Sequence, residues 1–172
     1  MLIIENYSYF YFIIDIVLAL IELSFVVFNS DDWNDIFRTE TIVIETSATG
    51  QFTQPLPNTI QTIFEQDSIY VAYMDMEESW LGTEVVFFIA NNTEDMITVQ
   101  VRDEAVNGFM RSGIMSADVM PGKMAVSTMS FGSWELEEND IDHIETIEFR
   151  FHIFSRDDWA NSITTDLIRI TP

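Results

Sequence analysis

The 172-residue sequence contains no cysteine, which excludes disulfide bonds, thiolate metal sites and cysteine nucleophiles. Basic residues are scarce: 7 Lys and Arg stand against 29 Asp and Glu, and the formal net charge is −22. A surface this acidic repels phosphate backbones and anionic headgroups, so we expect no nucleic-acid partner. The hydrophobic fraction is 48%, which is enough for a folded core.

The motifs of common enzyme classes are also missing. The two histidines, His143 and His152, form no H-x-x-x-H or H-E-x-x-H pattern, and we interpret both as surface residues. No G-x-S-x-G, G-x-G-x-x-G or P-loop sequence occurs. We therefore expect a protein that is not an enzyme and that needs no cofactor.

Residues 1–28 are strongly apolar, yet they do not match a targeting segment. Glu5, Asp15 and Glu22 interrupt the run, and the first basic residue is Arg38. A signal peptide begins with basic residues and ends in a small-residue cleavage site, and a carboxylate in mid-membrane is costly. We expect neither a signal peptide nor a transmembrane helix here, and membrane contact only through an anchor at or beyond the N-terminus.

The chain contains an internal repeat. Residues 21–46 align with residues 147–172 without a gap, at an offset of 126 residues, and ten of the 26 aligned positions are identical. Because such a match predicts one structural unit present twice, we expect residues 1–46 to be the C-terminal strands of a β-sandwich unit. Residues 47–58 then form a linker rich in Pro, Gly, Ser and Thr, and residues 59–172 a complete domain.

Alternation of apolar and polar side chains predicts strands over 68–75, 84–90, 96–102, 123–129 and 145–154. Residues 91–95 are interpreted as a hairpin loop, and Asn107-Gly108 and Pro121-Gly122 as turns. One helical turn is expected within 136–141. About seven short strands at this spacing favour an all-β, antiparallel, immunoglobulin-like sandwich.

The repeated Asp-Asp-Trp sequence is the most distinctive motif. Crowded oxygen ligands in a loop suit Ca²⁺, and the candidate ligands are Asp31, Asp32, Asp35, Asp157, Asp158 and Asn161. The spacing differs from that of an EF-hand loop and lacks its glycine. We favour a structural role, in which Asp caps a short turn and the tryptophan plugs the end of the sandwich.

Two further tryptophans are candidates for a binding surface. They are Trp80 and Trp134, the latter in the sequence Phe131-Gly132-Ser133-Trp134. Trp80 lies in a polar, turn-like segment, where a tryptophan either caps the core or is a contact residue. Five methionines between residues 110 and 129 line either a binding face or an irregular core, and we favour the core. Carboxylate pairs such as Glu77-Glu78, Glu137-Glu138 and Asp140/Asp142 follow from composition alone.

Turn motifs recur along the second part of the chain: Asn-Asn-Thr precedes a strand, Val-Asn-Gly follows it and Pro-Gly-Lys precedes the next. The segments that carry this pattern are 89–108, 119–123, 136–141 and 144–151. This pattern resembles immunoglobulin-like β-sandwich modules of uncharacterised secreted proteins and lipoproteins of Gram-positive gut bacteria. The resemblance implies a non-catalytic extracellular or cell-surface module, often in tandem, and it carries over no functional residue.

We therefore expect an interaction or structural module of a bacterial cell envelope, with a protein or glycan partner. The alternatives are a carboxylate-based glycan hydrolase and a calcium-stabilised adhesin repeat. Unpaired strands in residues 16–46 also predict either extension of the sandwich or a strand-swapped homo-oligomer.

Overall fold

The computed structural model describes residues 20–28, 35–51, 55–59, 61–80, 82–155, 160 and 162–172. The chain divides into two compact units, Met1–Leu56 and Pro57–Pro172, and the division falls inside the segment that we expected to be a linker. Each unit is described separately below.

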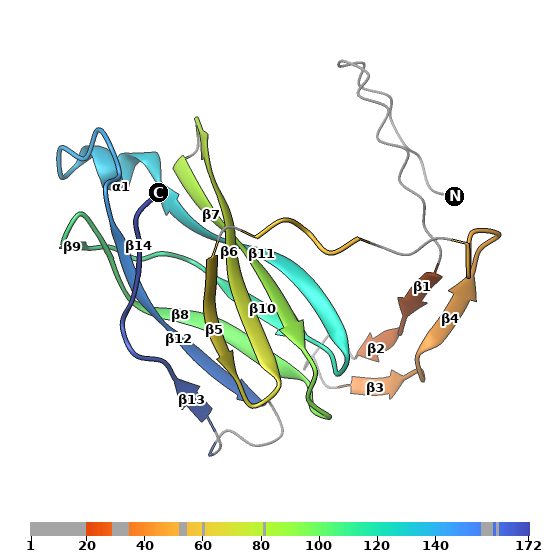
Figure 1. The fold of residues 1–172 in the computed structure, drawn as a ribbon. Helices are drawn as coiled ribbons and strands as arrows, with labels where there is room; N and C mark the ends of the chain where they lie inside the picture. Colours follow the sequence, from red (N-terminus) through yellow and green to blue (C-terminus); the bar gives the residue numbers. More distant parts are fainter. Residues whose placement is uncertain are drawn as a thin grey trace. The chain divides into compact units, whose positions relative to one another are not determined.

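The Pro57–Pro172 unit is an antiparallel β-sandwich, which confirms the prediction of an all-β, antiparallel fold (Figure 1). One sheet has the strand order β11 (Lys123–Gly132), β7 (Gly82–Asn91), β6 (Ile69–Ser79) and β5 (Gln61–Gln66). The other has the order β10 (Ser116–Val119), β8 (Ile97–Val106), β12 (Ile147–Ser155) and β13 (Ser162–Thr164), with β14 (Ile168–Ile170) also paired to β12 and β9 (Phe109–Met110) to β8. The short helix α1 (Ser133–Glu137) follows β11.

The core forms where the inward faces of the two sheets meet. Val85, Phe87 and Ile89 of β7 are fully buried, and so are Phe149 and Phe151 of β12. The Phe87 ring centroid lies 5.6 Å from those of both Phe149 and Phe151, in edge-to-face geometry. These aromatic contacts join the sheets, and the period-two pattern in the sequence places their residues inside.

The segment 91–95 differs from our expectation, because it does not close a hairpin. β7 pairs with β6 and β11, whereas β8 belongs to the other sheet and pairs with β10, β9 and β12. Both edges of β7 are therefore occupied, and the chain must cross between the sheets at this corner. Turn residues mark where a strand ends, but they do not specify which strand it pairs with.

A buried asparagine holds this corner together. The Asn91 side chain is fully buried, and its Nδ2 donates to the carbonyl oxygens of Asp95 and Val119, both at 2.8 Å. Its Oδ1 accepts from the backbone N–H of Thr93 at 3.0 Å and from the Thr93 hydroxyl at 2.7 Å. One amide thereby ties the end of β7 to the loop after it and to the end of β10.

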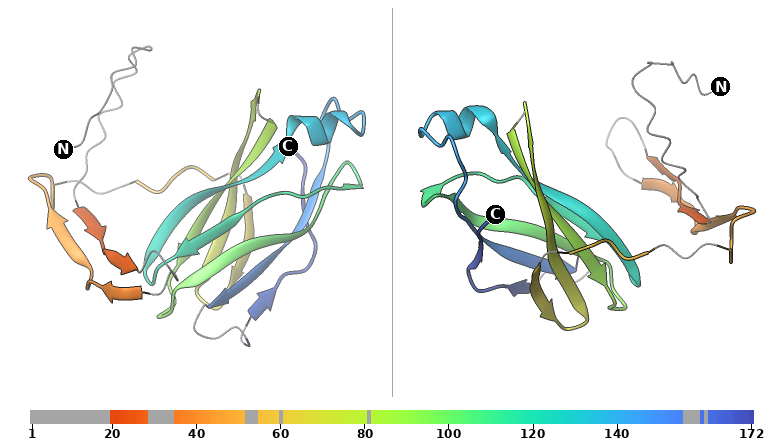
Figure 2. Two further views of the ribbon diagram at one scale, coloured as in Figure 1. Left: turned by 180° about the vertical axis from the view of Figure 1, so that it is seen from behind. Right: turned by 45° about the horizontal axis from the view of Figure 1, so that its top comes forward.

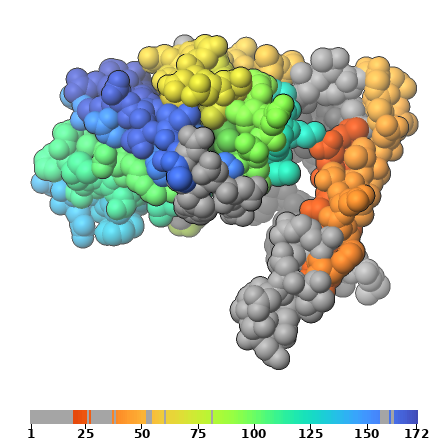
Figure 3. Space-filling model, turned by 90° about the horizontal axis from the view of Figure 1, so that it is seen from below, coloured from red at the N-terminus to blue at the C-terminus, as the bar shows by residue number. Residues whose placement is uncertain are grey.

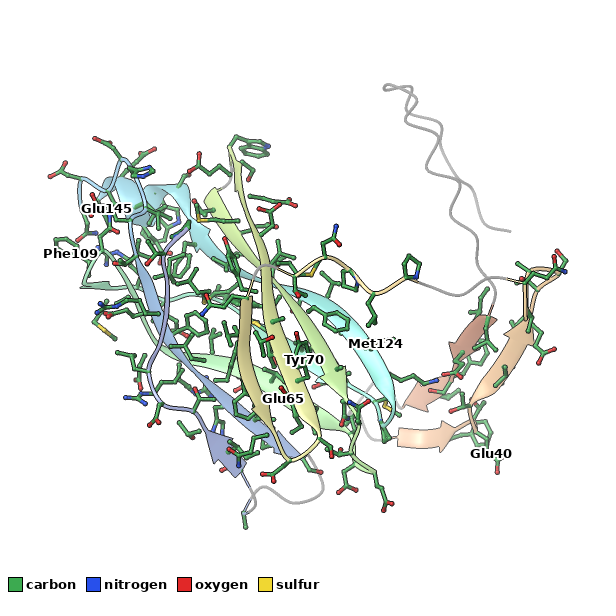
Figure 4. The ribbon with its side chains drawn as sticks, in the orientation of Figure 1. Glu40, Glu65, Tyr70, Phe109, Met124 and Glu145 are labelled. Atoms are coloured by element: carbon green, nitrogen blue, oxygen red, sulfur yellow. The ribbon has the colours of Figure 1, made fainter. Side chains whose placement is uncertain are left out.

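The methionine cluster is divided between the core and the surface, so the core interpretation is wrong for part of it. Met115 and Met129 are buried, whereas Met110, Met120 and Met124 are exposed. Met124 and Val126 lie on the outward face of β11, where their register partners on β7 are Ala90 and Phe88. Figure 4 shows Met124, Tyr70 and Glu65 across the strands of this sheet.

The described residues of the Met1–Leu56 unit form two antiparallel strand pairs. β1 (Leu20–Leu23) pairs with β4 (Ile42–Glu45), and β2 (Val26–Phe28) pairs with β3 (Asp35–Arg38). We call these four strands the N-terminal ribbon, and β12, β13 and β14 the C-terminal ribbon. Strands β1 and β2 correspond to β12 at the repeat offset, β3 corresponds to β13 and β4 to β14.

The two ribbons have the same strand register. Ile21 pairs with Ile44 in one ribbon and Ile147 with Ile170 in the other, which is the repeat offset of 126 at both positions. The Val27–Phe37 pair corresponds in the same way to Ile153–Ile163. The segments therefore share one arrangement of strands as well as similar sequences.

Candidate functional site

The Asp-Asp-Trp loops connect equivalent strands, β2 to β3 and β12 to β13. Five of the six calcium candidates, namely Asp31, Asp32, Asp157, Asp158 and Asn161, lie outside the described residues, as do Trp33 and Trp159. The sixth, Asp35, begins β3, and its side chain is not described. Within the described part of the chain, no cluster of three or more His, Asp or Glu side chains has the geometry of a metal site. The calcium interpretation stays a prediction.

The two remaining candidates, Trp80 and Trp134, occupy the same end of the sandwich. Trp80 lies in the turn between β6 and β7, and Trp134 lies in α1, directly after β11. The register places Gly82 opposite both Ser79 and Gly132, so the β6–β7 turn and the start of α1 are neighbours. Figure 2 shows both at one end of the sheets, which we call the α1 end.

Trp80 is 86% exposed, so it does not cap the core. Gly82 makes this position possible, because its φ of +141° suits only glycine and a Cβ there would lie 1.9 Å from the Phe131 carbonyl oxygen. The close approach of β7 and β11 at Gly82 fixes the position where the β6–β7 turn ends. The indole of Trp80 stands beyond it, in solvent.

Trp134 is 61% exposed, and its indole lies against the backbone of Gly132. A Cβ at Gly132 would lie 2.8 Å from Trp134 Nε1, so the absence of a side chain there makes room for the ring. Gly132 has a φ of −67° and is the residue before the helix. The position therefore demands a small residue and not an unusual backbone angle.

Two cavities lie at the α1 end, and both are lined by Ser79, Gly82 and Thr83. Trp134 lines the first, and Trp80 is not among the lining residues of either. The first has a volume of about 280 Å³ and is lined by Trp134, Ile114 and Phe131, together with Glu84 and Glu135. Ile114 is 77% exposed and forms a bridge to Ser130 of β11. Nothing in the sequence around Ile114 indicated this position, because an isolated isoleucine after a glycine has no recognisable pattern.

The second cavity, of about 260 Å³, is lined by residues of α1 and of the loop after it, including His143. One carboxylate from each of the three predicted pairs also lines it, namely Glu78, Glu137 and Asp142. Asn107 anchors this loop, because its Oδ1 accepts from the backbone N–H of Glu145 at 2.8 Å and its Nδ2 donates to the His143 carbonyl at 2.7 Å. Figure 4 shows Glu145 at this end, beside the exposed Phe109.

The α1 end is acidic as well as aromatic. Glu77 and Glu84 stand directly opposite each other on β6 and β7, an arrangement in which like charges repel. Glu84 and Glu135 line the Trp134 cavity, and the linings of the two cavities contain no Lys or Arg. A cation above the Trp134 ring would be attracted both by the indole face and by these carboxylates.

A larger cavity, of about 570 Å³, lies elsewhere, between β5 and residues 163–169, whose yellow and blue surfaces adjoin in Figure 3. Its walls are strand edges, and its aromatic side chain, Phe64, is half-buried against the core. Size alone therefore favours this groove, but the exposed aromatic side chains are at the α1 end. We select the α1 end because exposed tryptophans are the side chains most often found at binding hot spots.

The histidines have separate surroundings. His152 lies on β12, where its Nδ1 is 3.1 Å from the Thr164 hydroxyl and its ring centroid is 5.3 Å from that of Phe154. His143 lies in the loop after α1 and is exposed. The structure thus does not bring the two histidines into one cavity among those described above.

Comparison with models of known protein families and with curated proteins gives no match for this chain. Within the described residues, no helix has the length and apolar character needed to cross a membrane. The functional assignment therefore depends on the geometry of the site.

Proposed function

We propose that this protein is a non-catalytic interaction module of a bacterial cell envelope, extracellular or at the cell surface, and that the α1 end is its binding surface. The observation that carries the proposal is the pair of exposed tryptophans, Trp80 and Trp134, at one end of the sandwich, where Trp134 lines one of two cavities. When a partner covers an exposed tryptophan, the apolar surface of the indole leaves water, which favours binding. Two exposed tryptophans at one end therefore favour a binding surface there.

The strand pairing supports an immunoglobulin-like module. In such folds strand B pairs with E in one sheet, and C pairs with F and F with G in the other. β7, β11, β8 and β12 follow this order as B, E, C and F, and β13 with β14 take the place of G. The hairpin partner β5 is an addition to this pattern. The asparagine motifs that carry the family resemblance hold corners of the fold, since Asn91 and Asn107 each bind several backbone groups.

The partner that suits this surface is a protein or a glycan of the envelope. Aromatic rings stack on apolar sugar faces or receive apolar and cationic side chains, whereas the carboxylates around Trp134 repel polyanions. A glycan hydrolase or a calcium-dependent adhesin would place its chemistry among the carboxylates, and we propose neither, because the exposed aromatic rings are the more specific feature.

The test uses the fluorescently labelled full chain and isolated envelopes of a Gram-positive bacterium. Trp80→Ala and Trp134→Ala should each weaken binding, and a loss of about 2 kcal/mol for a hot-spot tryptophan corresponds to about a 30-fold rise in Kd. Met124→Ala is the control, because Met124 is also exposed but lies on the outward face of β11. Protease treatment of the envelopes removes a protein partner, and glycosidase treatment removes a glycan.

Gly132→Ala is a second, sharper variant. It displaces the Trp134 indole without backbone strain, so binding should fall while the midpoint of urea unfolding stays close to that of the parent chain. Equal binding by the parent chain and both tryptophan variants would overturn the α1 end as the binding surface.

A further inference from the structure

The N-terminal ribbon repeats the C-terminal ribbon but leaves its apolar face in solvent. In the C-terminal ribbon, Phe151 is 0% exposed and Ile170 is 1% exposed, because they pack on the opposite sheet of the sandwich. The equivalent residues of the N-terminal ribbon, Phe25 and Ile44, are 58% and 45% exposed. The same positions in the same register are therefore core in one copy and surface in the other.

The exposed face consists of side chains that the register places on one side. Leu23 pairs with Ile42, Ile21 with Ile44 and Val27 with Phe37, and Phe25 lies between these pairs. Each corresponds to a residue that faces the core in the C-terminal ribbon, where the positions are Ile147, Phe149, Phe151, Ile153, Ile163, Ile168 and Ile170. An apolar face of the kind that the sandwich buries is thus present, and the described strands of this unit include no second sheet that covers it.

Counting strands shows what can cover this face. Among the residues that the structure describes, one chain holds one set of strands β5–β11, and its own C-terminal ribbon already fills the place beside β8. If the ribbons were exchanged between copies, each chain would still have one ribbon left over. Docking onto a second copy's sandwich therefore does not remove the exposed face, whereas packing two N-terminal ribbons together does.

We propose that the apolar face of the N-terminal ribbon packs against the same face of a second copy of this chain. The contact is isologous, so each ribbon provides to its partner the apolar layer that the opposite sheet provides in the sandwich. Five side chains of this face are 40–58% exposed, namely Phe25, Val27, Phe37, Ile42 and Ile44. They form a small face compared with the roughly 800 Å² that each partner buries in a standard interface. A dimer that dissociates on dilution is therefore expected.

Electrostatics gives the proposal a distinctive signature. Two copies that each carry a net charge of −22 repel each other, and salt screens this repulsion while leaving the apolar contact intact. Dimerisation should therefore tighten as the salt concentration rises. An interface made of ion pairs would weaken under the same change.

The test is sedimentation equilibrium of the full chain over a wide concentration range, at low and high salt. The mass should rise from 19.9 kDa toward twice that value, and more readily at high salt. Ile44→Asp should weaken association at least tenfold. Val43→Asp is the matched control: it adds the same charge one residue away, and Val43 is 52% exposed on the opposite face of β4.

The possible outcomes separate clearly. A mass that stays at 19.9 kDa under every condition overturns the proposal and indicates that the chain covers the face itself. Equal effects of the two Asp substitutions, or none from either, place the contact elsewhere and also overturn it. Because the concentration and salt series uses the unmodified chain, the result does not depend on whether the Ile44→Asp ribbon keeps its fold.

Discussion

Thr165 and Phe151 are joined by hydrogen bonds in both directions. The Thr165 hydroxyl accepts from the backbone N–H of Phe151 at 3.0 Å, and the Thr165 N–H donates to the Phe151 carbonyl at 3.0 Å. Thr39 makes the same two bonds to Phe25, both at 2.9 Å, at the repeat offset of 126. In each ribbon, one threonine lies between the last two strands, β13 and β14 or β3 and β4. It continues the hydrogen bonding to the facing segment where neither strand is paired.

Thr165→Val should therefore destabilise the sandwich. The substitution keeps the shape of the side chain but leaves the N–H of Phe151 without its acceptor in a buried position, which costs about 1–3 kcal/mol. Urea unfolding measures this loss, and Thr171→Val, at an exposed position beyond β14, should change stability by no more than about 0.5 kcal/mol.

Thr39→Val tests the same bond where water is available. The Phe25 N–H lies in an exposed setting, so solvent replaces the hydroxyl and the loss should be smaller. Amide hydrogen exchange at Phe25 should accelerate in this variant, while exchange at Phe151 should not change. An equal or larger stability loss for Thr39→Val than for Thr165→Val would contradict this explanation.

Asn91→Ala, at the end of β7, should be among the most damaging single changes at a strand end of this protein. It removes four hydrogen bonds, and among them the buried bond to the Val119 carbonyl has no replacement from water, whereas the Asp95 carbonyl keeps the Thr93 hydroxyl at 3.0 Å; the cost should be about 1–3 kcal/mol. The adjacent Asn92 is exposed and provides the control, since Asn92→Ala should be nearly neutral. Comparable losses from both substitutions, measured by urea unfolding, would show that the buried amide is not what holds the corner.

Much of the fold could be predicted because the strands alternate so regularly. Ile147, Phe149, Phe151 and Ile153 face inward as the pattern indicates, and the repeat alignment anticipated the shared register of the two ribbons. Pairing was harder to predict. The segment 91–95 resembles a hairpin loop locally, and only the occupation of both edges of β7 decides that it is a corner.

The candidate site could be predicted only in part, and for a similar reason. Composition and context identified Trp80 and Trp134, but their position at one end depends on the pairing of Gly82 with both Ser79 and Gly132. Ile114 joins them through a single bridge to Ser130, which no local pattern encodes. Met124 was expected inside because it belongs to a strand-like run with Ala125, Val126 and Met129, yet β11 is an edge strand whose outward face is open to solvent.

Gly82→Ala should destabilise the protein far more than Gly108→Ala. Both glycines have a positive φ, so both substitutions introduce backbone strain of about 1–3 kcal/mol. At Gly82 the added Cβ would also lie 1.9 Å from the Phe131 carbonyl oxygen, whereas at Gly108 it would meet nothing within 4 Å. Thermal unfolding should therefore show a substantially larger drop in Tm for Gly82→Ala. Similar drops for both variants would show that backbone strain alone accounts for the effect.

Glu104 provides a prediction about pH. Burial is the main cause that raises the pKa of Glu104 above its ordinary value of 4.5, and the Asp103 carboxylate also raises it, although Arg102 acts in the opposite direction. Because the folded state holds this proton more tightly than the unfolded state, ionisation of Glu104 lowers the free energy of unfolding as the pH rises from about 4.5 through the higher folded-state pKa.

Glu104→Gln removes this dependence, since the amide is neutral at every pH. The variant should be more stable than the parent chain at pH 7, and its advantage should disappear below pH 4.5, where the parent carboxyl is protonated in both states. Glu94→Gln removes the same unit of charge from an exposed loop and corrects for the general repulsion within an acidic chain. Urea unfolding across this pH range gives the comparison, and an advantage of Glu104→Gln that equals that of Glu94→Gln at pH 7 would show that net charge, and not burial of this carboxyl, sets the effect.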